Sequence, residues 1–202
     1  MKENIEKEIA KNFEKKEKII EHNNTCILEA TIFYENIFLF YIIKKIFLNE
    51  NFEKNKKMYK FICERMTFSD RYEIIKEFAK NNNIKTISNT DFEFFIKIRN
   101  IIAYRITGIR EYNINNRETV VSFGEELINW KEYVEKIKKW AEISYKIAEF
   151  SENVYHFVND SKNDSIIFFK YYKYNKDCVL MKHELVLQEP GGTCIDTGKQ
   201  ID

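Results

Sequence analysis

Four side chains that could handle a phosphate or a proton lie close together in the chain: Arg99, Asn100, Tyr104 and Arg105. They come near the end of an apolar stretch, residues 90–109, that reads TDFEFFIKIRNIIAYRITGI. An arginine guanidinium matches two oxygens of a phosphate and never loses its charge in a protein. An amide and a phenol can add hydrogen bonds. The residue types therefore fit a site that binds a phosphodiester.

The apolar stretch predicts the helix that must position these side chains. Its large apolar residues follow a three-and-four spacing, which is typical of a helix with one buried face; they are Phe94, Phe95, Ile98, Ile101 and Ile102. Thr90 is the predicted N-cap, with Asp91 and Glu93 in the first turn, where the helix dipole favours acidic residues.

The same helix constrains which polar side chains can act together. Asn100 and Tyr104, four residues apart, share a face, whereas Arg99 and Tyr104 are separated by about 140° around the axis. Because unpaired polar groups on a buried helix are costly, Arg99 and Asn100 also have a structural interpretation. In that interpretation they only bond the turn that follows a neighbouring helix.

The run Arg99-Asn100-Ile101-Ile102-Ala103-Tyr104 resembles the motif of the HEPN superfamily, whose usual form is close to Arg-Asn-x-x-Ala-His. Five of the six positions match, and Tyr104 stands where the family has its histidine. The segment 65–71, RMTFSDR, is similar to a turn that often opens a preceding helix in these bundles. The resemblance covers roughly residues 25–150.

The resemblance implies a metal-independent endoribonuclease site, formed where two copies meet, with no cofactor and no metal. Such proteins belong to toxin–antitoxin, phage-defence or stress systems and tend to form homodimers. The catalytic positions would be Arg99, Asn100 and Tyr104, and the RNA-binding positions Arg99 and Arg105. A free phenol has a pKa of about 10, so roughly one in a thousand is ionised at neutral pH. Because Tyr104 is such a poor base, we expect the ribonuclease chemistry to be absent or reduced.

Two other interpretations stay open. The chain could be a protein–protein interaction bundle with no nucleic-acid role, binding a protein partner or antitoxin through its aromatic helix and its C-terminal hairpin. Alternatively, an active ribonuclease could take its histidine from elsewhere in the fold. His156, which follows the last predicted helix, is the nearest candidate for that role.

Composition limits these choices. The net charge of +1 gives no overall attraction to nucleic acid or to an anionic membrane, so RNA binding needs a local basic patch. The four cysteines form no C-x-x-C pair and have no zinc-like spacing with the three histidines. The five glycines form no phosphate-binding loop. The N-terminus is charged throughout, unlike a signal peptide, so we expect a cytoplasmic protein without a membrane partner.

The predicted fold is mainly α: a HEPN-like helical bundle with a small β insertion and a C-terminal β-hairpin. The expected parts are an amphipathic helix over residues 1–24 that ends at Asn23 and Asn24, the bundle over 25–155, the hairpin over 156–187 and a disordered tail over 188–202. Residues 26–48 approach the length of a membrane span. Five polar or charged residues inside that stretch favour a bundle helix instead; they are Glu29, Glu35, Asn36, Lys44 and Lys45.

Overall fold

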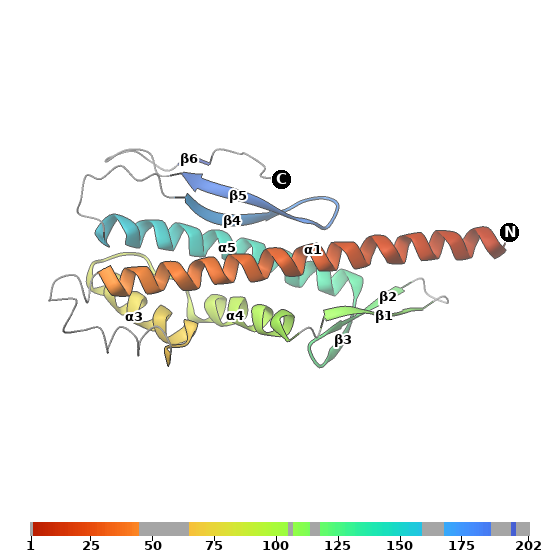
Figure 1. The fold of residues 1–202 in the computed structure, drawn as a ribbon, viewed down its shortest axis with the longest axis horizontal. Helices are drawn as coiled ribbons and strands as arrows, with labels where there is room; N and C mark the ends of the chain where they lie inside the picture. Colours follow the sequence, from red (N-terminus) through yellow and green to blue (C-terminus); the bar gives the residue numbers. More distant parts are fainter. Residues whose placement is uncertain are drawn as a thin grey trace.

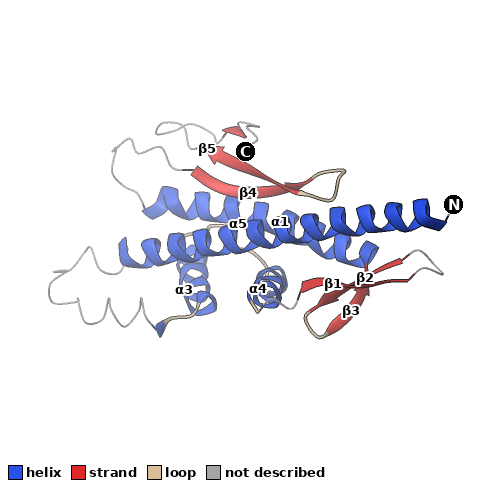
Figure 2. Cartoon of the chain, turned by 45° about the vertical axis from the view of Figure 1, so that its right-hand side comes forward, coloured by secondary structure: helices blue, strands red, loops and turns tan. Residues whose placement is uncertain are grey.

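The computed structural model describes residues 2–44, 65–104, 107–113, 118–158, 168–186 and 195–196. These residues form three layers (Figures 1 and 2). The middle layer consists of helices α1 (Lys2–Ile42) and α5 (Trp130–Val158). On one side lies a sheet of β4 (Phe168–Tyr174), β5 (Leu180–Val186) and β6 (Ile195–Asp196). On the other lie α3 (Phe68–Asn81), α4 (Asn89–Ala103) and a sheet of β1 (Thr107–Asn113), β2 (Glu118–Phe123) and β3 (Glu126–Asn129).

This architecture confirms the mainly helical fold with a small antiparallel sheet and a C-terminal hairpin. Strands β1 and β2 form the predicted β insertion; they pair antiparallel, with Tyr112 opposite Thr119. Strand β3 was not predicted; it follows β2 through a two-residue turn, Gly124-Glu125. The positive φ of Gly124, 68°, is the conformation that a type II′ turn needs at this position.

Helix α1 is a single helix of 41 residues, so the predicted end at Asn23 and Asn24 is wrong. Asn23 points into the protein, where its amide bonds the backbone of the hairpin. Thr25 does not cap a second helix; its hydroxyl donates to the carbonyl of Glu21 one turn earlier. The helix therefore crosses the predicted boundary between the first two parts of the chain.

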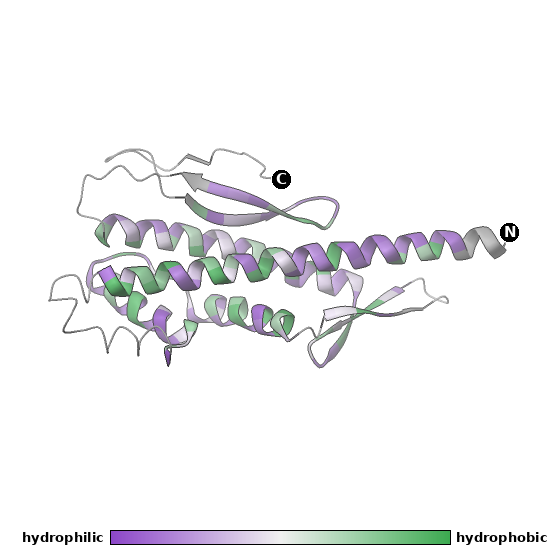
Figure 3. Ribbon diagram, in the orientation of Figure 1, coloured by the Kyte–Doolittle hydropathy of each residue, from purple (hydrophilic) through white to green (hydrophobic). Residues whose placement is uncertain are grey.

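The two halves of α1 differ in polarity. The N-terminal end projects beyond the bundle in Figure 1, and the N-terminal half is mostly hydrophilic, while the other half is largely apolar (Figure 3). One window of 18 residues within Lys7–Ile42 is apolar enough to cross a membrane by length and composition alone. The fold buries 44% of that window, as expected of a bundle helix, so the window is weak evidence for a membrane span.

Helix α4 is positioned by aromatic packing. The Phe92 ring stacks on Tyr72 of α3, with centroids 3.7 Å apart, and the Phe95 ring stacks on Trp140 of α5 at 5.0 Å. Ser88, and not the predicted Thr90, is the N-cap; its hydroxyl accepts from the N–H of Asp91. The buried face of α4 consists of Phe92, Phe95, Ile98 and Ile102, whereas Phe94 and Ile101 are only half-buried.

Helix α3 begins with a capping box, within the segment 65–71. The hydroxyl of Thr67 accepts from the N–H of Asp70, and the Asp70 carboxylate accepts from the N–H of Thr67 at 2.9 Å. These bonds hold the pKa of Asp70 below its ordinary value. At the start of α5, the side chain of Asn129 accepts from the N–H of Glu132 at 2.9 Å.

The C-terminal hairpin is bound to both helices of the middle layer. The Tyr34 hydroxyl of α1 donates to the carbonyl of Lys170, and the Ser144 hydroxyl of α5 accepts from the N–H of Tyr172 at 3.1 Å. Helix α5 runs to Val158, past the predicted boundary at 155/156. Within the predicted tail, the structure describes Ile195–Asp196, which pair with β5; the remainder of 188–202 lies outside the described residues.

Candidate functional site

The candidate site lies at the C-terminal end of α4. Tyr104 is the C-cap of the helix, and its N–H bonds the carbonyl of Asn100 at 3.2 Å. Its side chain is 76% exposed, although the sequence places it at the end of a strongly apolar helix. Arg99 and Asn100 are half-buried one turn earlier. The helix thus ends by presenting polar groups to solvent.

Arg99 and Asn100 bond each other. A guanidinium nitrogen of Arg99, Nη1, donates to Oδ1 of Asn100 at 3.0 Å. Between Arg99 and the turn of a neighbouring helix, no hydrogen bond is found among the described residues. The interaction that the structural interpretation needs is therefore not seen in the described part of the chain, and the amide of Asn100 instead helps to orient the guanidinium.

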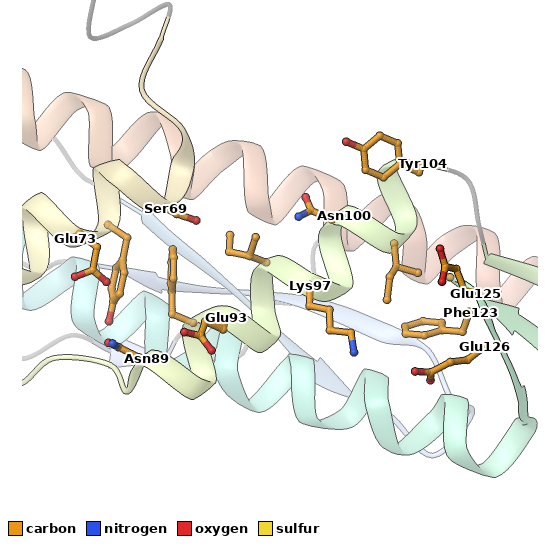
Figure 4. A pocket seen from close by; sticks show the side chains of 15 residues that line it. Ser69, Glu73, Asn89, Glu93, Lys97, Asn100, Tyr104, Phe123, Glu125 and Glu126 are labelled. Carbon is orange, nitrogen blue, oxygen red and sulfur yellow. The ribbon is translucent and has the colours of Figure 1, made fainter.

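A groove of about 770 Å³ runs along α4, between α3 and the turn that joins β2 to β3 (Figure 4). Asn100 and Tyr104 both line this groove, in agreement with their predicted position on one helical face. Arg99 does not line it. The fourth predicted residue, Arg105, lies outside the described residues. The structure therefore brings Arg99 to Asn100, and Asn100 to Tyr104, but does not bring all three into one groove.

The charge of the groove is unfavourable for a phosphate chain. Among the described residues, four glutamates and a single lysine supply the charged side chains of its lining: Glu73, Glu93, Glu125, Glu126 and Lys97. Two of the glutamates are partly neutralised, since Glu73 bonds Lys76 at 2.8 Å and Glu126 lies 3.8 Å from Lys136. An acidic excess remains, so an RNA backbone laid along the groove would be repelled.

No histidine of the chain approaches Tyr104 within one copy. Helices α4 and α5 run antiparallel, because Asp91 of α4 bonds Lys146 of α5 at 2.7 Å, whereas Phe95, one turn later in α4, stacks on the earlier residue Trp140 of α5. Tyr104 and His156 lie on opposite sides of that contact, so they are about 35 Å apart at 1.5 Å of rise per residue. His22 of α1 bonds the carbonyl of Leu180 of β5 at 2.9 Å, and His183 lies on β5, so both are on the side of the middle layer that faces away from α4 (Figure 1).

A second groove, of about 1140 Å³, lies between α5 and β4 and was missed by the sequence analysis. Tyrosines and lysines from both elements line it, among them Tyr145, Lys138 and Lys173. The sequence carries part of the signal, because Lys138, Glu142, Tyr145 and Glu149 recur at helical spacing on one face of α5. The periodicity marks an outer face, but it does not show that β4 lies beside that face.

No protein-family model, curated protein or solved structure matches this chain. The description of function therefore rests on the chain's own residues. Among the described residues, no group of three or more histidine, cysteine, aspartate or glutamate side chains could hold a metal ion. In the described part of the chain, the two grooves and the motif at the end of α4 are the candidate features for function.

Proposed function

We propose that this protein is a HEPN-like, RNA-associated protein in which ribonuclease chemistry is absent or reduced because Tyr104 replaces the motif histidine. One observation carries the proposal: the Arg-Asn-x-x-Ala-Tyr run ends a bundle helix at an accessible position, with Arg99 bonded inside the motif and Tyr104 exposed. If the motif were purely structural, its polar side chains would instead form hydrogen bonds with neighbouring helices or turns.

Each motif residue has a chemical role in this proposal. Arg99 binds a phosphate of the RNA, and Asn100 holds the guanidinium through the 3.0 Å bond. Tyr104 stacks on a base or donates a hydrogen bond to a phosphate oxygen. It does not remove the proton of a ribose 2′-hydroxyl efficiently, because a phenol is rarely ionised at neutral pH. Arg105 directly follows Tyr104 in the sequence, and in this proposal it contacts a second phosphate.

The proposal includes a homodimer. Arg99 does not line the groove that contains Tyr104, and we propose that a second copy completes the phosphodiester site. A second copy related by a two-fold axis would place its own α4 end against the first. The cellular setting that the motif implies is a cytoplasmic toxin–antitoxin, phage-defence or stress system, in which an antitoxin or another protein partner would control the dimer.

Cleavage of a mixed RNA pool tests the catalytic part of the proposal. Three proteins are compared: the chain as it stands, Tyr104→His, and Tyr104→His combined with Arg99→Ala. We expect cleavage only by Tyr104→His, because histidine restores a base near working pH and Arg99 stabilises the phosphate. If all three proteins are inert while circular dichroism shows them folded, the motif is not a ribonuclease site.

RNA affinity tests the binding part separately. Arg99→Ala should weaken the binding of a single-stranded RNA and reduce its salt dependence, since one phosphate contact is lost. Arg110→Ala is the matched control, because Arg110 is an exposed arginine on β1 outside the motif. Equal affinities for the two variants would count against a role of Arg99 in RNA binding.

The acidic groove favours a second candidate function, a protein–protein interaction bundle. A glutamate-rich lining beside the exposed Tyr104 ring is suited to a basic, apolar segment of a partner protein. This candidate predicts a co-purifying protein and a ratio of absorbance at 260 and 280 nm that is typical of protein alone. A preparation that contains RNA and no second protein would contradict it.

A further inference from the structure

The groove between α5 and β4 contains a tyrosine placed as a stacking surface. Tyr145 is 43% exposed, and its ring meets Tyr171 of β4 edge-to-face, with centroids 5.0 Å apart and planes at 74°. Such a contact covers at most one face of the Tyr145 ring. Tyr171 is itself fully buried and stacks on His183 of β5 at 5.3 Å. The platform is therefore held in place and keeps a face for a planar ligand.

Lysines surround this platform. Nζ of Lys138 lies 5.4 Å from the centroid of the Tyr174 ring, and Nζ of Lys173 lies 5.5 Å from that of Tyr171. Both side chains are exposed, so their ammonium groups lie at the rim of the groove. Lys138 is seven residues, or two helical turns, before Tyr145 and shares its face of α5. The ammonium group of Lys138 and the ring of Tyr145 therefore line the same groove between α5 and β4.

The charge of this groove is opposite in sign to that of the motif groove. In the part of the chain that the structure describes, its ionisable lining comprises four lysines and three acids; the lysines are Lys85, Lys138, Lys146 and Lys173, and the acids are Asp91, Glu142 and Glu149. One pair is internal, since Lys146 bonds Asp91 at 2.7 Å. Counted over the described residues, the formal charge of this lining is +1 (four lysines, three acids), whereas that of the motif groove is −3 (one lysine, four glutamates). An anion is therefore better accommodated between α5 and β4.

We infer that this groove binds a nucleotide unit, with the base stacked on Tyr145 and a phosphate held by Lys138 and Lys173. An aromatic face beside lysines is the combination that proteins use for unpaired nucleotides. The volume of about 1140 Å³ is large for a compact small ligand and has room for a segment of strand. Two sources share this chemistry, a free mononucleotide and a single-stranded RNA. The inference does not depend on whether Arg99 contacts RNA.

Binding is measured with the full chain and two probes: a fluorescein-labelled ten-nucleotide oligouridylate, followed by anisotropy, and unlabelled UMP as competitor. Tyr145→Ala should weaken oligonucleotide binding about tenfold, because the stacking surface is removed. Tyr145→Phe, which keeps the ring, should restore most of the affinity. Phe157→Ala is the matched control, since Phe157 is an aromatic residue of α5 with 46% exposure that does not line the groove.

Salt dependence tests the lysines. Lys138→Gln should lower the slope of log affinity against log salt by about 0.7, the value for one lost contact to single-stranded nucleic acid. Lys131→Gln should leave it unchanged, because Lys131 is an exposed lysine of α5 outside the groove. Competition by UMP at micromolar concentration would identify a free nucleotide as the ligand. Competition by unlabelled oligonucleotide alone would identify a single strand.

The outcomes separate this inference from the proposed function. If Tyr145→Ala binds like Phe157→Ala, the inference is overturned, whatever Arg99→Ala does. If Tyr145→Ala loses affinity and Arg99→Ala does not, the groove between α5 and β4 is the binding site and the proposed role of Arg99 in RNA binding fails. If the unsubstituted protein binds neither probe, the nucleotide site does not exist.

Discussion

Replacing Asn23 by alanine tests how the C-terminal hairpin is held on the helical layer. Asn23 is fully buried in the middle of α1. Its Oδ1 accepts from the N–H of Leu180 at 2.9 Å, and its Nδ2 donates to the carbonyl of Cys178 at 3.0 Å. A longer bond of 3.4 Å reaches the hydroxyl of Tyr133 on α5. One amide thus pairs a donor and an acceptor of the backbone where β5 begins.

The expected cost follows from these contacts. Alanine removes the partner of two backbone groups, and each unpaired buried group costs roughly 1–3 kcal/mol. Alanine is a better helix former than asparagine by roughly 0.5 kcal/mol, which offsets part of the loss. We therefore expect Asn23→Ala to lower the free energy of unfolding by about 2–5 kcal/mol. Against a typical stability of roughly 5–15 kcal/mol, this is a large fraction.

Urea unfolding followed by far-ultraviolet circular dichroism measures this cost, with Asn24→Ala as the control. Asn24 is the next residue of the same helix, it is half-buried, and its Oδ1 has no hydrogen-bond partner among the described residues. Its replacement should change stability by less than about 0.5 kcal/mol or raise it slightly. If the two variants unfold at the same urea concentration, Asn23 does not hold the hairpin and the reasoning fails.

Three further predictions concern local features. Ser88→Ala should lower the free energy of unfolding in urea by about 1 kcal/mol, and Thr90→Ala should hardly change it, because Ser88 caps α4. A larger loss from Thr90→Ala than from Ser88→Ala would show that Thr90 is the N-cap, as predicted from the sequence. Gly124→Ala should destabilise by roughly 1–2 kcal/mol, since φ is +68° and the new Cβ would lie 3.4 Å from Ile101; an unchanged urea midpoint would contradict this. Burial raises the pKa of Cys26 to about 11, so little thiolate is present near pH 8. Because the folded state favours the neutral thiol, the stability that this thiol contributes is lost as the pH rises from about 9 to 11. Iodoacetamide at pH 8 should therefore alkylate Cys26 roughly a hundredfold more slowly in the folded protein than in urea, as measured by peptide mass spectrometry. Equal rates in the two states would contradict the raised pKa of Cys26.

Features that depend on neighbouring residues could be predicted from the sequence. The Thr67–Asp70 capping box involves residues three apart, and the two hairpins follow from alternating apolar residues around short polar turns. The same holds for Asn100 and Tyr104, whose shared face follows from helical geometry alone. In each case the partners are close in the chain, so residue type and spacing define the interaction.

Features that depend on distant partners could not be predicted. A pair of asparagines ordinarily interrupts a helix, but Asn23 bonds residues more than 150 positions away, which stabilises the helix through it. Ser88 and Thr90 are both good N-caps, and neither residue type nor spacing distinguishes them. The acidic excess of the motif groove also has a distant origin, because Glu73 comes from α3 and Glu125 from the turn between β2 and β3.

The exposure of Tyr104 makes its replacement a decisive test of the motif. Because the ring is 76% exposed at the end of α4, the fold does not require a phenol at this position. Tyr104 is the C-cap of α4 through its backbone only, and replacement of an exposed side chain without bonding partners usually changes stability by less than about 0.5 kcal/mol. The side chain of Tyr104 makes no bond to the core among the described residues; only its N–H bonds the carbonyl of Asn100, and any residue other than proline keeps that bond. Tyr104→His therefore changes the chemistry at the end of α4 without changing the fold there. A Tyr104→His protein that is folded but does not cleave RNA would contradict the assignment of the motif as a ribonuclease site.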